Sequence, residues 1–214
     1  KFMSTLWNLE NCRKAGYQIN GRAIAQRHGN REVYAKATVL ERWQDPQKML
    51  GHQLDDFKIR SKYKDDFIPV LSSSFGGGRI FASAFGCSMK WSSENEDPWA
   101  KPIVAKPEDV YNLPFPKVTD GLLGKVLEYT KFFREKTRGA YSIAADVRSP
   151  LDIASQMWKY ENFLLAMYTN PKEVHFLLNM ITHLLISFVK TQRDIAGDFV
   201  SNTMAGWAPP NWGL

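Results

Sequence analysis

Apolar and polar positions follow helical and strand periods through much of the chain. Residues 171–196 place an apolar side chain at every third or fourth position, which predicts one long helix with a single buried side. Asn170 and Pro171 stand at its start and Gly197 at its end, and these residue types begin and end helices. Short apolar runs at 67–71, 141–146 and 198–202 predict buried strands. Strands that alternate with helices indicate an α/β fold.

The stretch 141–160 shows one strand and helix in close succession. Its apolar run ends at Asp146, and Ser149 and Pro150 follow as an N-cap and a first-turn proline. We expect Asp152 to add a capping-box contact and to face the positive end of the helix dipole. The stretch therefore predicts a βα unit, and polar residues in such turns are where α/β enzymes place their chemistry.

The regions before and between these strands predict helices and loops. Residues 1–65 indicate a helical extension in which Asp45 begins one helix, and a further helix should run from Asp120 to about residue 138. The glycine-rich turn at 72–79 either presents N–H groups to an anion or simply lets the chain reverse. The proline-rich segment 92–116 predicts an extended loop, whose indoles at Trp91 and Trp99 either line a pocket or pack the loop down.

Charge sets the N-terminal extension apart. Residues 1–64 contain 13 Lys and Arg against 6 Asp and Glu, whereas the rest contains 15 against 16. A basic segment can bind an anionic partner, but no nucleic-acid motif accompanies this one, so we favour a solvated helical surface.

Order and spacing over about residues 46–199 carry a resemblance to a known family. The run 146–155, the segments 161–168 and 170–175, and the upstream segments 67–70 and 82–87 together resemble the uroporphyrinogen decarboxylase superfamily. This resemblance implies a (β/α)8 TIM barrel and a tetrapyrrole decarboxylase or a corrinoid- or coenzyme-M-dependent methyltransferase. With 214 residues and three strands, we expect residues 66–214 to form the first half of such a barrel, after the extension 1–65.

In a βα barrel the active site lies at the carboxyl ends of the strands, and this rule selects the candidate residues. Asp146 is the catalytic candidate, with helix capping or pairing with Arg148 as its structural alternative. The substrate-binding candidates follow the three strands: Ser72, Ser74, Gly77, Arg79, Arg148, Asn202 and Trp207. We expect them to border one cleft, whose mixture of charge and aromatic surface suits a large acidic ligand such as a tetrapyrrole or corrinoid.

Departures from the decarboxylase pattern favour the methyltransferase branch. The Arg-rich N-terminal segment is missing, serines follow the first strand in place of an Asp, and Gln156 stands where decarboxylases carry a tyrosine. The resemblance then implies methyl transfer from a corrinoid to a thiol acceptor, with zinc and the corrinoid held by residues outside this half. The alternatives are a decarboxylase for a tetrapyrrole or another acidic substrate, and a non-catalytic tetrapyrrole- or corrinoid-binding protein.

Partners and location follow from what the sequence contains. Cys12 and Cys87 match no metal-binding spacing, and neither a signal peptide nor a bilayer-spanning run is evident. We therefore expect a cytoplasmic protein without a membrane or nucleic-acid partner. Its expected partners are a tetrapyrrole, a corrinoid protein or another acidic ligand. Because a three-stranded piece leaves a strand edge open, we also expect a homodimer or a second chain that completes the barrel.

Overall fold

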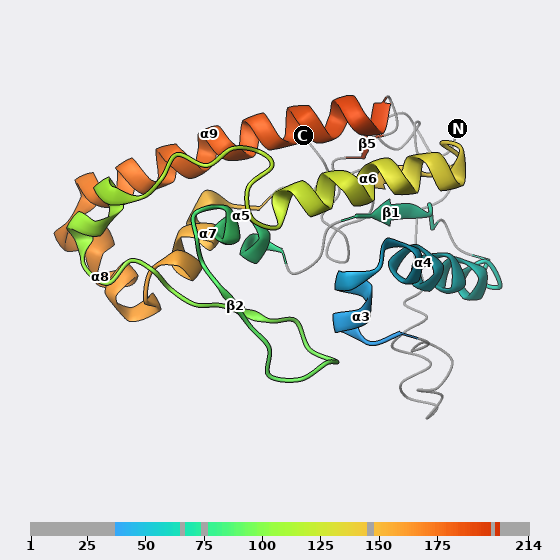
Figure 1. Ribbon diagram of the computed structural model, residues 1–214, viewed down its shortest axis with the longest axis horizontal. Coiled ribbons are helices and arrows are strands. Elements are labelled where there is room, and N and C mark those ends of the chain that lie inside the picture. Colours follow the sequence, from blue (N-terminus) through green and yellow to red (C-terminus); the bar gives the residue numbers. More distant parts are fainter. Residues whose placement is uncertain (1–36, 65–66, 74–76, 145–147, 198–199, 202–214) are drawn as a thin grey trace, which may run out of the picture.

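The computed structural model describes residues 37–64, 67–73, 77–144, 148–197 and 200–201 (Figure 1). Three parallel strands form its main sheet in the order β1-β4-β5: β1 (Val70–Ser72), β4 (Ser142–Ala144) and β5 (Val200–Ser201). Val70 pairs with Ser142, and Ile143 pairs with Val200. Each strand overlaps a predicted apolar run, with β1 reaching one residue past residues 67–71. The expected parallel neighbours are therefore confirmed.

Two long helices run side by side next to this sheet (Figure 1). They are α6 (Leu123–Thr137) and α9 (Pro171–Ala196). Three shorter helices follow the strands: α5 (Gly78–Ala84) comes after β1, and α7 (Pro150–Met157) and α8 (Tyr160–Thr169) come after β4. Helix α7 packs against both α5 and α9. The segments that follow two neighbouring strands therefore meet each other.

The N-terminal helices α3 (Val39–Gln44) and α4 (Pro46–Arg60) pack onto the same core as the strands. Gln53 on α4 forms two hydrogen bonds with the backbone of Ser72 in β1. Its Nε2 donates to the carbonyl oxygen at 2.9 Å, and its Oε1 accepts from the N–H at 2.7 Å. Figure 1 shows β1 between α4 and α6. Residues 37–64 are helical outside short turns, as expected, while a domain boundary at residue 65 stays a prediction.

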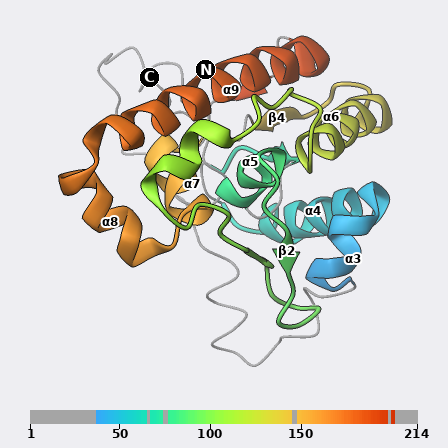
Figure 2. The ribbon, with the colours of Figure 1, turned by 60° about the vertical axis from the view of Figure 1, so that its left-hand side comes forward.

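A hairpin and a 3-10 helix occupy the proline-rich region. Strands β2 (Met89–Lys90) and β3 (Trp99–Ala100) are antiparallel and project away from α9 in both views (Figures 1 and 2). The segment continues through the 3-10 helix η2 (Pro107–Asn112). The N–H groups of Ile103 and Val104 both donate to the carbonyl oxygen of Met157, at 2.8 and 3.0 Å. The end of α7 therefore fixes this segment in place.

The local start signals of two helices are confirmed. Ser149 accepts a hydrogen bond from the Leu151 N–H at 3.2 Å, and Pro150 is the first residue of α7. Asp45 accepts from the N–H groups of Gln47 and Lys48 at the start of α4. Side-chain caps of this kind each stabilise a helix by about 1 kcal/mol.

Other predicted capping contacts are wrong. The Asp120 carboxylate accepts from the Lys117 N–H at 2.8 Å and so closes a turn before α6. Instead, the N–H of Leu122 at the start of α6 donates a 2.8 Å hydrogen bond to Oγ of Ser83 on α5. Asn170 precedes α9 as predicted, but its side chain makes no capping bond, and Asp152 forms no capping box.

The core includes one buried polar cluster that joins three elements. Ser73 follows β1, Thr130 lies on α6 and Gln192 lies on α9, and all three are buried. The two hydroxyl oxygens are 2.7 Å apart, and Nε2 of Gln192 lies 3.2 Å from each. The cluster therefore ties the end of β1 to both long helices. By length and composition α9 could cross a membrane; here its apolar side packs against α6, α7 and α8.

Candidate functional site

The segments that follow β1 and β4 meet at Gly77 and Arg148. Gly77 has φ +60 and ψ −130, a backbone conformation that favours glycine. A Cβ at this position would lie 3.2 Å from Cζ, Nε and Nη2 of Arg148. The missing side chain therefore lets the guanidinium group lie against the backbone. Because β1 and β4 are parallel neighbours, this contact lies at the edge of the sheet where their carboxyl ends meet.

The next residue, Gly78, packs against two polar side chains of α7. A Cβ there would lie 2.6 Å from Nε2 of Gln156 and 2.7 Å from Oδ2 of Asp152. Gln156 Nε2 also donates a 3.3 Å hydrogen bond to Oδ1 of Asp152. The Asp152 side chain is exposed, whereas Oε1 of Gln156 is buried and has no hydrogen-bond partner. The guanidinium group of Arg148 therefore lies against Gly77, and the side chains of Gln156 and Asp152 lie against Gly78.

Arg79 adds a second cation next to an aromatic ring. Its Cζ lies 5.4 Å from the ring centroid of Trp99, which is 62% exposed. Trp91 instead packs edge-on against Trp43, with ring centroids 5.1 Å apart. Of the two indoles, which were expected either to line a pocket or to pack the loop down, Trp99 lies beside a candidate arginine. Trp91 fits the packing interpretation.

The two serines at the end of β1 have different surroundings. Ser72 is partly buried, and its backbone is bound to Gln53 as described. The side chain of Ser73, which was not a predicted site residue, belongs to the buried polar cluster. Only Ser72 of this pair therefore stays a candidate for ligand contact.

Half of the candidate residues fall outside the part of the chain that the structure describes. These are Asp146, Ser74, Asn202 and Trp207. The structure brings Gly77 and Arg148 together and places Arg79 two residues further along. A cleft shared with the segment after β5, and the functional role of each residue, stay predictions.

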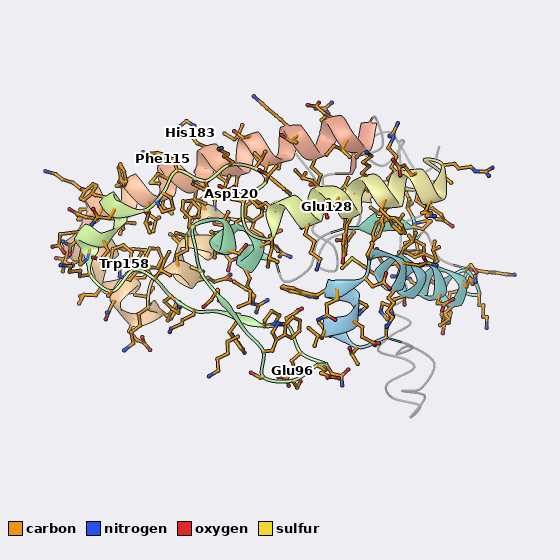
Figure 3. All side chains as sticks on the ribbon, in the orientation of Figure 1. Glu96, Phe115, Asp120, Glu128, Trp158 and His183 are labelled. Atoms are coloured by element: carbon orange, nitrogen blue, oxygen red, sulfur yellow. The ribbon has the colours of Figure 1, made fainter. Side chains whose placement is uncertain are left out.

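The described residues support neither metal ligation nor thiol chemistry. Within them no three His, Cys, Asp or Glu side chains are grouped so that they could hold a metal ion, so these residues do not fit a zinc site. His175 and His183 are exposed on α9, and Figure 3 labels the second. Burial raises the pKa of the Cys87 thiol to about 11, which leaves it protonated and unreactive near neutral pH.

Comparison with known proteins shows the family. The family model described as uroporphyrinogen decarboxylase (URO-D) matches residues 22–208. The chain belongs to the uroporphyrinogen decarboxylase family. Among solved structures, it is similar to a methyltransferase from Methanosarcina mazei, with a TM-score of 0.66 and 16% sequence identity. The match covers 94% of this chain and 57% of that one, and no curated protein matches.

Family and structural neighbour together support a TIM-barrel-type α/β fold for this member of the URO-D family. The described residues are rich in helix and contain only three strands of the main sheet. That residues 66–214 are the first half of an eight-stranded barrel stays a prediction.

Sequence reasoning missed Asp152 and Gln156 as members of the site. It assigned Asp152 to a helix cap and noted Gln156 only as a departure from the decarboxylases. Their spacing of four residues on a predicted helix was the available signal, because side chains at that spacing lie on one face. Nothing in the sequence showed that this face packs against Gly78.

Proposed function

We propose that this member of the URO-D family is a methyltransferase that transfers a methyl group to a thiol acceptor and holds an acidic ligand beside Gly77. The guanidinium group of Arg148, lying against the Gly77 backbone where the carboxyl ends of β1 and β4 meet, is the observation that carries the proposal. The structural similarity to a methyltransferase supports the reaction class.

The arrangement has the chemistry to bind an acid. A guanidinium group has five N–H donors in a fixed plane, so it can serve a carboxylate or sulfonate in addition to protein partners. Arg79 contributes a second positive charge, and the exposed ring of Trp99 offers an apolar surface next to it. An organic acid with an apolar part matches these groups.

Only the family resemblance implies a corrinoid methyl donor and a zinc ion. A corrinoid would supply the methyl group, and zinc would activate the thiol. Because no described group of side chains fits zinc, no step of the reaction is assigned to a metal ligand in this part of the chain. Here the described residues bind and orient the acid.

The second candidate is decarboxylation of a tetrapyrrole or another acidic substrate. The description of the matching family favours it, and the same arginines would bind the substrate acids. A third candidate, a tetrapyrrole- or corrinoid-binding protein without catalysis, would use the site for binding alone.

The test compares these reactions in the full chain. Methylcobalamin and 2-mercaptoethanesulfonate are supplied together and the loss of methylcobalamin absorbance is followed, with uroporphyrinogen decarboxylation assayed in parallel. We expect thiol-dependent demethylation and an increase in KM for the thiol of about tenfold or more in Arg148→Ala, because charge-assisted hydrogen bonds are lost. Arg193→Ala is the matched control, since Arg193 is exposed at the far end of α9.

Each other outcome has a defined meaning. Loss of uroporphyrinogen carboxyl groups without demethylation would favour the decarboxylase. Ligand binding with neither reaction would favour the non-catalytic protein. Demethylation that is equally fast in Arg148→Ala would exclude the acid-binding role of Arg148.

A further inference from the structure

The amide of Gln156 leaves one buried acceptor without a partner. Its Oε1 has no hydrogen-bond partner, although the atom is shielded from solvent. A buried carbonyl without a donor is less stable than one that accepts a hydrogen bond. Such groups are uncommon in native proteins, and each calls for an explanation such as a functional role or a bound water or ion.

Asp152 fixes which end of this amide is free. A carboxylate accepts hydrogen bonds and cannot donate one, so the Gln156 group that faces Asp152 must be the NH2. The same NH2 group lies over the position where Gly78 lacks a side chain. The carbonyl oxygen is therefore left as an acceptor with a set orientation.

We propose that Gln156 is a specificity-determining residue whose side-chain oxygen accepts a hydrogen bond from the ligand, and that Asp152 is its positioning residue. This inference rests on the proposed acid site, because Arg148 and Gln156 contact the consecutive glycines 77 and 78. It goes further by requiring a second group on the ligand, an N–H or O–H donor.

The two contacts also limit the size of the ligand's polar part. Consecutive Cα atoms are about 3.8 Å apart, so groups that lie against Gly77 and Gly78 are near neighbours. The acid of the ligand, bound by Arg148, and its donor, bound by Gln156, should therefore lie near each other in one molecule. Short hydroxy or amino acids and sulfonates, or larger molecules that carry such an end, meet this requirement.

A matched pair of probes tests this requirement in the full chain. Ethanesulfonate and 2-hydroxyethanesulfonate have the same charge and differ by one hydroxyl group, and their dissociation constants are measured by ligand-observed NMR. We expect the hydroxylated probe to bind about threefold to tenfold tighter, the effect of one hydrogen bond. In Gln156→Met the ratio should fall to about one, whereas Arg148→Ala should weaken both probes equally.

The results separate failure of this inference from failure of the acid site. Equal binding of both probes to the wild type, with loss in Arg148→Ala, would exclude the role of Gln156 and keep the acid site. A ratio that persists in Gln156→Met would also exclude it. If the wild type binds neither sulfonate, both proposals are wrong.

A ligand-free measurement gives a second readout. Replacing a buried, unsatisfied acceptor by an apolar side chain of similar length should leave the free energy of unfolding unchanged or raise it. We therefore expect Gln156→Met to unfold at the same or a higher urea concentration, with the exposed Gln47→Met as control. Clear destabilisation by Gln156→Met would show a structural role and would overturn the inference.

Discussion

At the scale of single residues, Gly77 sets the geometry of the candidate site. Its positive φ favours glycine, and a Cβ there would lie 3.2 Å from the Arg148 guanidinium group, which would have to shift. We predict that Gly77→Ala lowers the free energy of unfolding by about 1–3 kcal/mol, because the backbone becomes strained and the guanidinium group must move. Urea denaturation measures this loss, and weaker sulfonate binding should accompany it.

Gly51→Ala is the matched control for this substitution. Gly51 lies inside α4, and a Cβ there would meet no atom within 4 Å. The change should stabilise the protein by about 0.5–1 kcal/mol, since alanine is the better helix former. If both alanine variants behave alike, the close approach at Gly77 does not contribute to stability.

Tyr129 makes stability depend on pH in the alkaline range. Its ring is 3% exposed, its hydroxyl donates to the Trp43 carbonyl oxygen at 3.0 Å, and burial raises its pKa to about 12. The folded state thus holds this proton more tightly than the unfolded state, whose tyrosine titrates near 10. The stabilisation is complete below pH 10 and is lost as the pH rises through about 12.

We therefore predict a steeper fall in the free energy of unfolding between pH 10 and 12 for the wild type than for Tyr129→Phe, by on the order of 2 kcal/mol. Urea unfolding at several pH values in this range gives the comparison. Parallel curves for the two proteins would show that Tyr129 titrates normally.

At the scale of elements, Gln53 takes the place of a neighbouring strand. Its amide pairs with both backbone groups of Ser72, so this part of the outer edge of β1 is satisfied by a helix. We predict that Gln53→Met destabilises the protein by about 2 kcal/mol through two lost hydrogen bonds, and that the Ser72 amide then exchanges faster with solvent. Gln47→Met on the same helix should change neither quantity, because Gln47 is exposed.

The elements also show how far sequence reasoning reaches. Strand positions and the starts of α4, α7 and α9 were predictable because apolar runs, Ser149 and Asp45 act within a few residues. The start of α6 was not predictable, because the hydroxyl that accepts from its Leu122 N–H belongs to Ser83, far away in the chain. The meeting of Gly77 and Arg148 followed from the rule on strand ends. The contact between Gln156 and Gly78 depends on how α5 packs against α7, which no local pattern encodes.

At the scale of the whole molecule, helix α8 exposes several large apolar side chains to solvent. Its exposed large apolar side chains are Tyr160, Leu164, Leu165, Met167 and Tyr168. Among the described residues, β5 also pairs with one strand only. Apolar surface and an open strand edge both favour association.

We therefore predict that the 214-residue chain is not a stable monomer on its own and associates at micromolar concentration. Sedimentation measures the association, and Tyr168→Lys should reduce it because Tyr168 is 89% exposed on α8. Phe115→Lys is the control, since Phe115 is exposed away from α8 in the loop before α6 (Figure 3). Sharp two-state unfolding of a monomer at low concentration would contradict the prediction.

The hydrogen bond from the start of α6 to the hydroxyl of Ser83 has a consequence for the order of folding. The two residues it joins, Ser83 and Leu122, are 39 positions apart, so the bond can form only after the intervening chain has closed into a loop. Loop closure has an entropic cost and is slower than helix growth. The first turn of α6 should thus be completed late. Removing the hydroxyl would then accelerate unfolding and leave the folding rate almost unchanged.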